Sequence, residues 1–138
     1  MSKADRIMIF SLIVSFFLVL LPAVVPGADG PRTIAITATK NEKFIVQGQK
    51  EPTITAKPGE VLHLVITAEK GPEFEKDGTV HDFTIQELKD QGWNLRLKEG
   101  KNEFTVVAPD KPGEYVAECT VKCGPKHETM KAKLVVKP

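Results

Sequence analysis

The segment CTVKCGPKHETM, Cys119 to Met130, decides how this sequence is interpreted. It holds both cysteines of a chain of 138 residues, one of its three histidines and one of its three methionines, with the spacing C-x3-C-x3-H-x2-M. On an extended strand, residues four positions apart lie about 13 Å apart, so the two thiols could not share a metal ion there. We therefore expect a loop that begins after Cys119, bends at Gly124-Pro125 and leads into a strand near Met130.

The residues on either side of this segment alternate between apolar and polar side chains, as half-buried strands do. Cys119 is in phase with the apolar positions of EYVAEC, and Met130 is in phase with those of KAKLVV. Further upstream, His81 is in phase with the apolar positions of HDFTI. The sequence therefore predicts that His81, Cys119 and Met130 point into the apolar interior at one end of the fold.

The remainder of the chain after residue 32 also alternates, which predicts an all-β fold: a β-sandwich of roughly 105 residues with seven or so short strands. The tetrapeptide KPGE precedes two of these strands and favours a type II turn in each case. Residues 70–78 are the least regular, and residues 87–94 are expected to contain a helical turn. The predicted strands cover residues 33–39, 53–56, 61–68, 81–85, 102–108, 114–119 and 129–137.

The N-terminus has a different character. Lys3 and Arg6 precede residues 7–25, which carry no charge, and this order is typical of an export signal or an N-terminal membrane anchor. The length favours an uncleaved hydrophobic helix as a single anchor. We expect residues 1–27 to be this signal or anchor, 28–32 a linker and 33–138 a domain on the periplasmic or extracytoplasmic side of the membrane.

Outside the cytoplasm, two free thiols tend to oxidise unless a metal holds them. Two thiols, two imidazoles and a thioether together favour copper. Two alternatives stay open at this point. One is a zinc site of Cys119, Cys123, His127 and His81, which leaves Met130 unexplained. The other is a plain disulfide between the two cysteines.

The ligand pattern resembles that of the binuclear copper A domain of cytochrome c oxidase subunit II and of its relatives in nitrous oxide reductase. In that family a V-H-x-F strand precedes C-x3-C-G-x2-H-x2-M by 35 to 40 residues. This chain has Val80-His81-Asp82-Phe83, and Cys119 follows His81 after 38 positions. The resemblance covers most of residues 33–138 and implies a cupredoxin-like Greek-key β-sandwich with electron transfer as its role.

The resemblance also implies the role of each ligand. Cys119 and Cys123 would bridge two copper ions, with His81 and weakly held Met130 on one ion. His127 would bind the other ion with the main-chain carbonyl of Val121. The family usually has glutamate at the position of Val121, and it has an aromatic-rich segment where this chain has NEKFIV, so membership of an oxidase complex is left open.

The expected partner is a redox protein such as a c-type cytochrome or a terminal oxidase subunit. Lys122, Lys126 and Lys131 in the ligand loop would repel a basic donor. The alternatives in function are a mononuclear cupredoxin and a copper-handling protein that supplies an oxidase. The net charge of +1 gives no reason to expect nucleic acid.

No Ser-His-Asp arrangement, phosphate loop or paired-carboxylate motif stands out, which favours an electron carrier over an enzyme. His63 is out of phase with its apolar neighbours and is expected to face away from the core. Asp82 should lie on the face opposite His81, and Trp93 is expected to cover the edge of the core.

Overall fold

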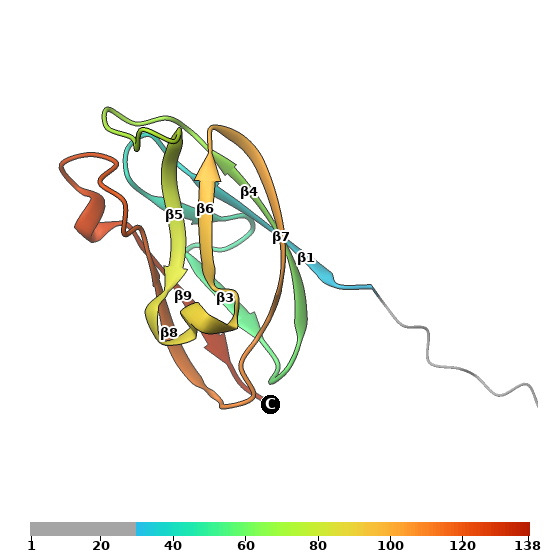
Figure 1. Ribbon diagram of the computed structural model, residues 1–138. Helices are drawn as coiled ribbons and strands as arrows, with labels where there is room; N and C mark the ends of the chain where they lie inside the picture. Colours follow the sequence, from blue (N-terminus) through green and yellow to red (C-terminus); the bar gives the residue numbers. More distant parts are fainter. Residues whose placement is uncertain (1–29) are drawn as a thin grey trace, which may run out of the picture.

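A computed structural model gives the fold, and it describes residues 30–138. Two β-sheets pack face to face, with strand order β2-β1-β4-β7 in one and β3-β9-β8-β5-β6 in the other (Figure 1). The pairs β1/β4 and β3/β9 are parallel, and the other paired strands are antiparallel. The elements are β1 (Arg32–Ala38), β2 (Phe44–Val46), β3 (Thr53–Ala56), β4 (Val61–Ala68), β5 (Thr79–Ile85), η1 (Gln86–Gln91), β6 (Asn94–Lys98), β7 (Gly100–Val107), β8 (Gly113–Glu118), η2 (His127–Thr129) and β9 (Lys131–Val136).

The seven predicted strands are all present: β3 and β4 have the predicted boundaries, and the boundaries of the other five are shifted by no more than two residues. Two strands were not predicted, β2 and β6. The prediction that residues 7–25 form a hydrophobic anchor or signal lies outside the described residues. Within residues 30–138, no helix is long and apolar enough to cross a membrane.

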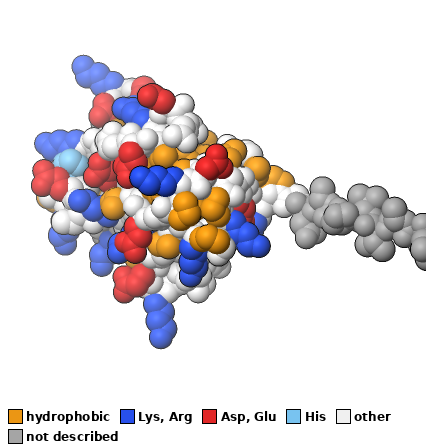
Figure 2. Space-filling view, turned by 90° about the horizontal axis from the view of Figure 1, so that it is seen from below, with side chains coloured by type: hydrophobic (Ala, Val, Ile, Leu, Met, Phe, Trp, Pro, Cys, Tyr) orange, Lys and Arg blue, Asp and Glu red, His pale blue; other side chains and the backbone are white. Residues whose placement is uncertain are grey.

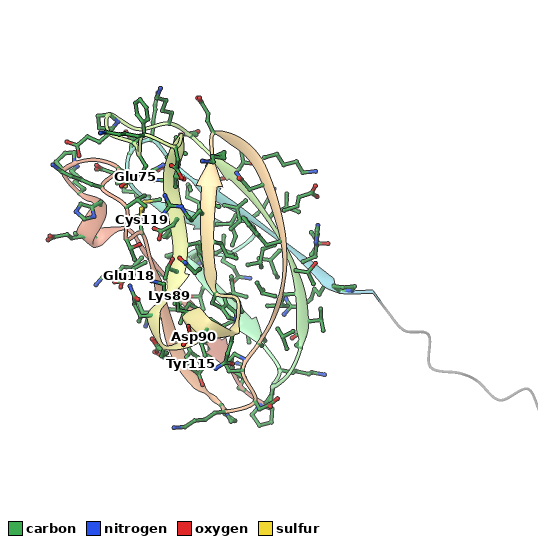
Figure 3. The ribbon with its side chains drawn as sticks, viewed as in Figure 1. Glu75, Lys89, Asp90, Tyr115, Glu118 and Cys119 are labelled. Carbon is green, nitrogen blue, oxygen red and sulfur yellow. The ribbon has the colours of Figure 1, made fainter. Side chains whose placement is uncertain are left out.

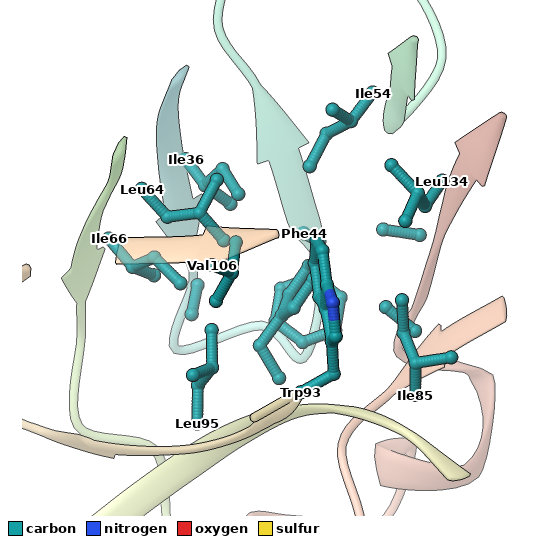
Figure 4. Close-up of a cluster of buried hydrophobic side chains, with 14 of the residues drawn as sticks. Ile36, Phe44, Ile54, Leu64, Ile66, Ile85, Trp93, Leu95, Val106 and Leu134 are labelled. Carbon is teal, nitrogen blue, oxygen red and sulfur yellow. The ribbon is translucent and has the colours of Figure 1, made fainter. Parts of the chain in front are cut away.

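The core forms from the alternating apolar positions of both sheets, which lie between the layers as the period of two requires (Figure 4). Phe44 of β2 meets Phe83 of β5 edge to face, with ring centroids 5.0 Å apart. Trp93 is fully buried, and its indole N–H donates to the Val107 carbonyl over 2.9 Å. Trp93 was expected to cover the edge of the core, and the structure buries it completely, where it ties η1 and β6 to β7 of the opposite sheet.

The two KPGE segments do not form the same structure. At Lys57–Glu60, Gly59 has φ +69° and the Glu60 N–H donates to the Lys57 carbonyl over 3.1 Å, as a type II turn requires. The second prediction is wrong: Gly113 has φ 157° and is the first residue of β8. There the Lys111 carbonyl accepts a hydrogen bond from the Tyr115 hydroxyl over 2.7 Å, so a side chain fixes this corner.

The residues 70–78 form the β4–β5 connection without regular structure, and 86–91 form the 3-10 helix η1, as predicted. The β1–β2 turn, the β4–β5 loop and the β8–β9 loop all lie at one end of the sandwich (Figure 1). The space-filling view from the lower side shows basic, acidic and apolar side chains interspersed (Figure 2).

Candidate metal centre

The ligand loop leaves β8 after Glu118 and returns at Met130, as the spacing predicted. The Cys119 N–H donates to the Met130 carbonyl over 3.1 Å, so the two ends of the loop are joined by their backbones. The Met130 and His127 N–H groups donate within the loop to His127 and Gly124 carbonyls over 3.1 and 3.3 Å. Cys119, which Figure 3 labels, and Met130 are both buried where the loop leaves and rejoins the sheet.

The two sulfurs lie next to each other. Cys119 Sγ is 3.4 Å from Cys123 Sγ, and both thiols are free and buried. Cys119 Sγ is also 3.4 Å from the Val121 carbonyl oxygen, and Cys123 Sγ is 3.9 Å from Met130 Sδ. Three of the soft donor groups that the sequence singled out thus meet in one buried volume, with a carbonyl oxygen pointing toward them.

His81 completes this cluster from β5, the strand that pairs with β8. Its Nδ1 is 4.0 Å from Cys119 Sγ, and its Nε2 lies 2.8 Å from the Glu69 carbonyl. Because a carbonyl only accepts, Nε2 carries the proton and Nδ1 keeps its lone pair toward the sulfurs. This is the arrangement that orients a metal-binding histidine. Ligand atoms of His81, Cys119 and Cys123 all lie within 4.8 Å of one another.

His127 lies at the start of η2 and is only partly buried. It does not join the compact cluster of His81 and the two cysteines. Its Nδ1 is nevertheless buried and has no hydrogen-bond partner among residues 30–138. A ring nitrogen without a hydrogen-bond partner can donate its lone pair to a metal ion.

The two thiols titrate as a coupled pair. The pKa of Cys119 is raised far above its ordinary value, mainly by its hydrogen bond with Cys123 and then by burial. The pKa of Cys123 is lowered, mainly because its sulfur accepts that bond. The hydrogen bond between the two sulfurs thus favours a thiolate, the form that binds metals, at one sulfur of the pair.

Asp82 has a role that the sequence did not indicate. It faces away from His81, as predicted, but it is 1% exposed. Its carboxylate accepts hydrogen bonds from the Thr84 hydroxyl over 2.8 Å, from the Val121 N–H over 3.3 Å, and from both the N–H and the hydroxyl of Thr120. Asp82 thus fixes the first residues of the ligand loop against β5.

Glycines let neighbouring loops approach the same segment. A Cβ on Gly71 would lie 2.7 Å from the Cys123 carbonyl oxygen. A Cβ on Gly124 would lie 1.6 Å from Glu42 Oε1. Gly124 was expected to supply a bend, and the structure adds that it leaves room for the carboxylate of Glu42.

The structure also places His63 and Lys122, which the sequence had singled out. His63 faces outward from β4, as predicted, with Nε2 3.3 Å from Glu103 Oε1. Lys122 lies 3.5 Å from Glu73 Oε2, so one of the loop lysines has an acidic neighbour.

No protein-family model matches the chain, and no curated protein matches its sequence significantly. Solved structures do match. A heme-copper terminal oxidase chain aligns with TM-score 0.57 at 20% identity over 78% of this chain and 66% of that one. The periplasmic domain of subunit II of the Bradyrhizobium japonicum cytochrome oxidase aligns with TM-score 0.54 at 18% identity over 82% and 87%.

A third match is auracyanin A, a "blue" copper protein from Chloroflexus aurantiacus, with TM-score 0.51 at 21% identity over 78% of this chain and 100% of that one. The chain has a cupredoxin fold. This chain covers all of auracyanin A but only 66% of the terminal oxidase chain. It therefore corresponds to part of that oxidase chain.

Proposed function

We propose that residues 33–138 form an exported electron-transfer domain that holds copper in a binuclear copper A-type centre. The observation that carries this proposal is the meeting of two thiols 3.4 Å apart with Nδ1 of His81 and Sδ of Met130 at one end of a cupredoxin fold. The proposed metal site consists of His81, Cys119, Val121 through its carbonyl, Cys123, His127 and Met130. Copper held by these residues would supply reversible one-electron transfer.

The donor set fits this group better than it fits zinc. A Cys2His2 zinc site uses no thioether, whereas here Met130 is fully buried with Sδ 3.9 Å from Cys123 Sγ. Soft sulfur donors with imidazole select copper. The unpartnered Nδ1 of His127 and the Val121 carbonyl supply two further donor atoms.

Electron transfer suits the surroundings better than catalysis does. His81, Cys119, Cys123 and Met130 are between 0% and 4% exposed. No substrate could reach these side chains without movement of the loop. His127 is the one proposed side-chain ligand that is partly exposed, so it offers the shortest route for an electron to a partner docked at this end.

Metal content and electron spin resonance of the purified chain test the proposal. We expect two coppers per chain and a purple, mixed-valence species whose unpaired electron is shared between two nuclei. Replacement of Cys119 or Cys123 by Ser should each abolish that spectrum. One copper per chain without sharing would contradict the binuclear centre.

A mononuclear cupredoxin centre is the second candidate. The likeness to auracyanin A and the position of His127 outside the compact cluster favour it. Such a centre would use His81, one cysteine, His127 and Met130, with the other cysteine spare. Variants that lack one cysteine discriminate between the two kinds of centre, because a mononuclear centre should survive replacement of one of the two cysteines.

We further propose that the domain lies outside the cytoplasm and exchanges electrons with a c-type cytochrome or a terminal oxidase subunit. The likeness to a periplasmic oxidase domain and the charge order of residues 1–27 support this location. Co-purification with a haem-containing subunit would support an oxidase role. Copper that exchanges readily with chelators would instead favour delivery of copper to an oxidase.

A further inference from the structure

Glu42 is an unusual residue beside the ligand loop. It lies in the turn between β1 and β2 and is only 5% exposed, yet its Oε1 has no hydrogen-bond partner among residues 30–138. It is also the one non-glycine residue of this range with positive φ, at 59°. Burying a carboxylate without a partner is costly, and so is a left-handed backbone at a residue with a side chain.

The carboxylate is directed at the ligand loop. Glu42 Oε1 occupies the space that a side chain at position 124 would fill, directly after Cys123 in the sequence. The Glu42 side chain therefore packs against the backbone of the ligand loop at the residue that follows Cys123.

The turn that carries Glu42 is tied to the residue that orients His81. Glu69 Oε2 accepts a hydrogen bond from the Lys40 N–H over 2.9 Å, while the Glu69 carbonyl accepts from His81 Nε2 over 2.8 Å. The Glu42 N–H donates to the Thr39 carbonyl over 3.0 Å, which closes the turn. The position of the carboxylate is thus fixed by the same contacts that fix a ligand.

We propose that Glu42 is a positioning residue of the metal centre: a fixed buried negative charge that compensates the charge of the bound metal. The inference rests on the proposed function. Without metal, the buried Oε1 of Glu42 has no partner among residues 30–138, whereas a bound metal would place positive charge near it. An anion at this place favours the oxidised form of the centre, which carries one more positive charge than the reduced form.

The test compares the purified wild-type chain with Glu42→Gln and, as a matched control, Glu75→Gln. Both variants remove one negative charge, but Glu75 is an exposed residue of the β4–β5 loop (Figure 3). In the metal-free state, we expect Glu42→Gln to unfold at a higher urea concentration than wild type. A merely structural role for Glu42 predicts the reverse.

With copper as the probe, we expect Glu42→Gln to bind about tenfold more weakly or worse, because a nearby buried charge acts through a low effective dielectric. Its reduction potential should rise above that of wild type, while Glu75→Gln stays near wild type. Equal potentials and affinities in all three proteins, with normal copper binding by wild type, would overturn this inference alone. Absence of copper binding by wild type would overturn the proposed function as well.

Discussion

Asp82 is a buried carboxylate that holds the ligand loop through hydrogen bonds from Thr84, Thr120 and Val121. Asp82→Ala leaves these donors without their acceptor. We expect it to lower the free energy of unfolding of the metal-free protein by about 2–4 kcal/mol, since buried unsatisfied donors carry the full cost of desolvation. Urea unfolding followed by fluorescence measures this.

Asp82→Asn is the matched variant, because its carbonyl oxygen can still accept from the backbone N–H groups. It should unfold at a urea concentration between those of wild type and Asp82→Ala. An unfolding midpoint of Asp82→Ala equal to that of wild type would show that the loop does not depend on this carboxylate.

Single residues show where prediction from the sequence ends. Strand phase placed His81, Cys119 and Met130 on one interior side, and the structure has them there. The same phase put Asp82 on the other face, but it could not show that Thr120 covers that face. Glu42 entered only as part of the segment NEKFIV, whose single aromatic residue is Phe44, because nothing local distinguishes a buried glutamate in a turn from an exposed one.

The β4–β5 loop is the element whose backbone packs against Cys123. We expect Gly71→Ala to weaken copper binding roughly tenfold or more, as loss of groups that support metal ligands commonly does. The added Cβ would lie 2.7 Å from a backbone oxygen, which cannot move aside without shifting Cys123. A copper titration of the folded protein measures the change.

Gly30→Ala is the control for this change, because no atom of residues 30–138 lies within 4 Å of a Cβ at that position. It should bind copper as wild type does. Equal copper affinity of Gly71→Ala and wild type would contradict the tight approach of this loop to the ligand.

Asp77 connects the β4–β5 loop to β6. Its pKa lies well below the ordinary value of 3.8, mainly through hydrogen bonds from Thr79 and also through Arg96 and Lys98. A depressed pKa in the folded state means that its contribution to stability is present above pH 4 and is lost as the pH falls through the folded pKa. Asp77→Asn should therefore flatten the fall of stability with pH below about 4, measured by urea unfolding across that range.

The control for Asp77 is Glu51→Gln, which removes an exposed acid from another loop. In this variant, the free energy of unfolding should fall below about pH 4 in the same way as in wild type. If the free energy of unfolding falls equally steeply with pH in Asp77→Asn and in wild type, the role of this carboxylate is contradicted.

Strands were predictable where the alternation was long. The eight residues of β4 and the six of β9 alternate between buried and more exposed positions, and every buried position is apolar. The three residues of β2 are too few to show a period, and β6 follows directly on η1, so neither was predicted. The two KPGE turns differ because the second is fixed by the distant Tyr115 hydroxyl, which a local motif cannot reveal.

At the scale of the whole molecule, the two sheets form one core that extends to the proposed metal centre. Cys119, Cys123 and Met130 belong to the same buried cluster as Trp93 and Phe83. Loosening of the ligand loop therefore exposes core residues, and unfolding of the core separates the ligands. Metal binding and global stability should be linked through this shared packing.

This linkage gives a prediction for the complete domain. Trp93 is the single tryptophan of the chain and is fully buried, so its fluorescence reports unfolding of the core. Copper at a free concentration of about 100 times its dissociation constant should raise the free energy of unfolding by about 2.7 kcal/mol, because the metal binds the folded state. The urea midpoint of wild type should rise with copper concentration.

The matched variant carries both Cys119→Ser and Cys123→Ser. It removes both thiols but keeps side chains of similar size at the two positions. Its midpoint should not depend on copper. A rise of equal size in the double variant would mean that copper stabilises the domain at another place. Independence of both proteins from copper would mean that the buried thiols, the histidine and the thioether form part of the core without holding a metal.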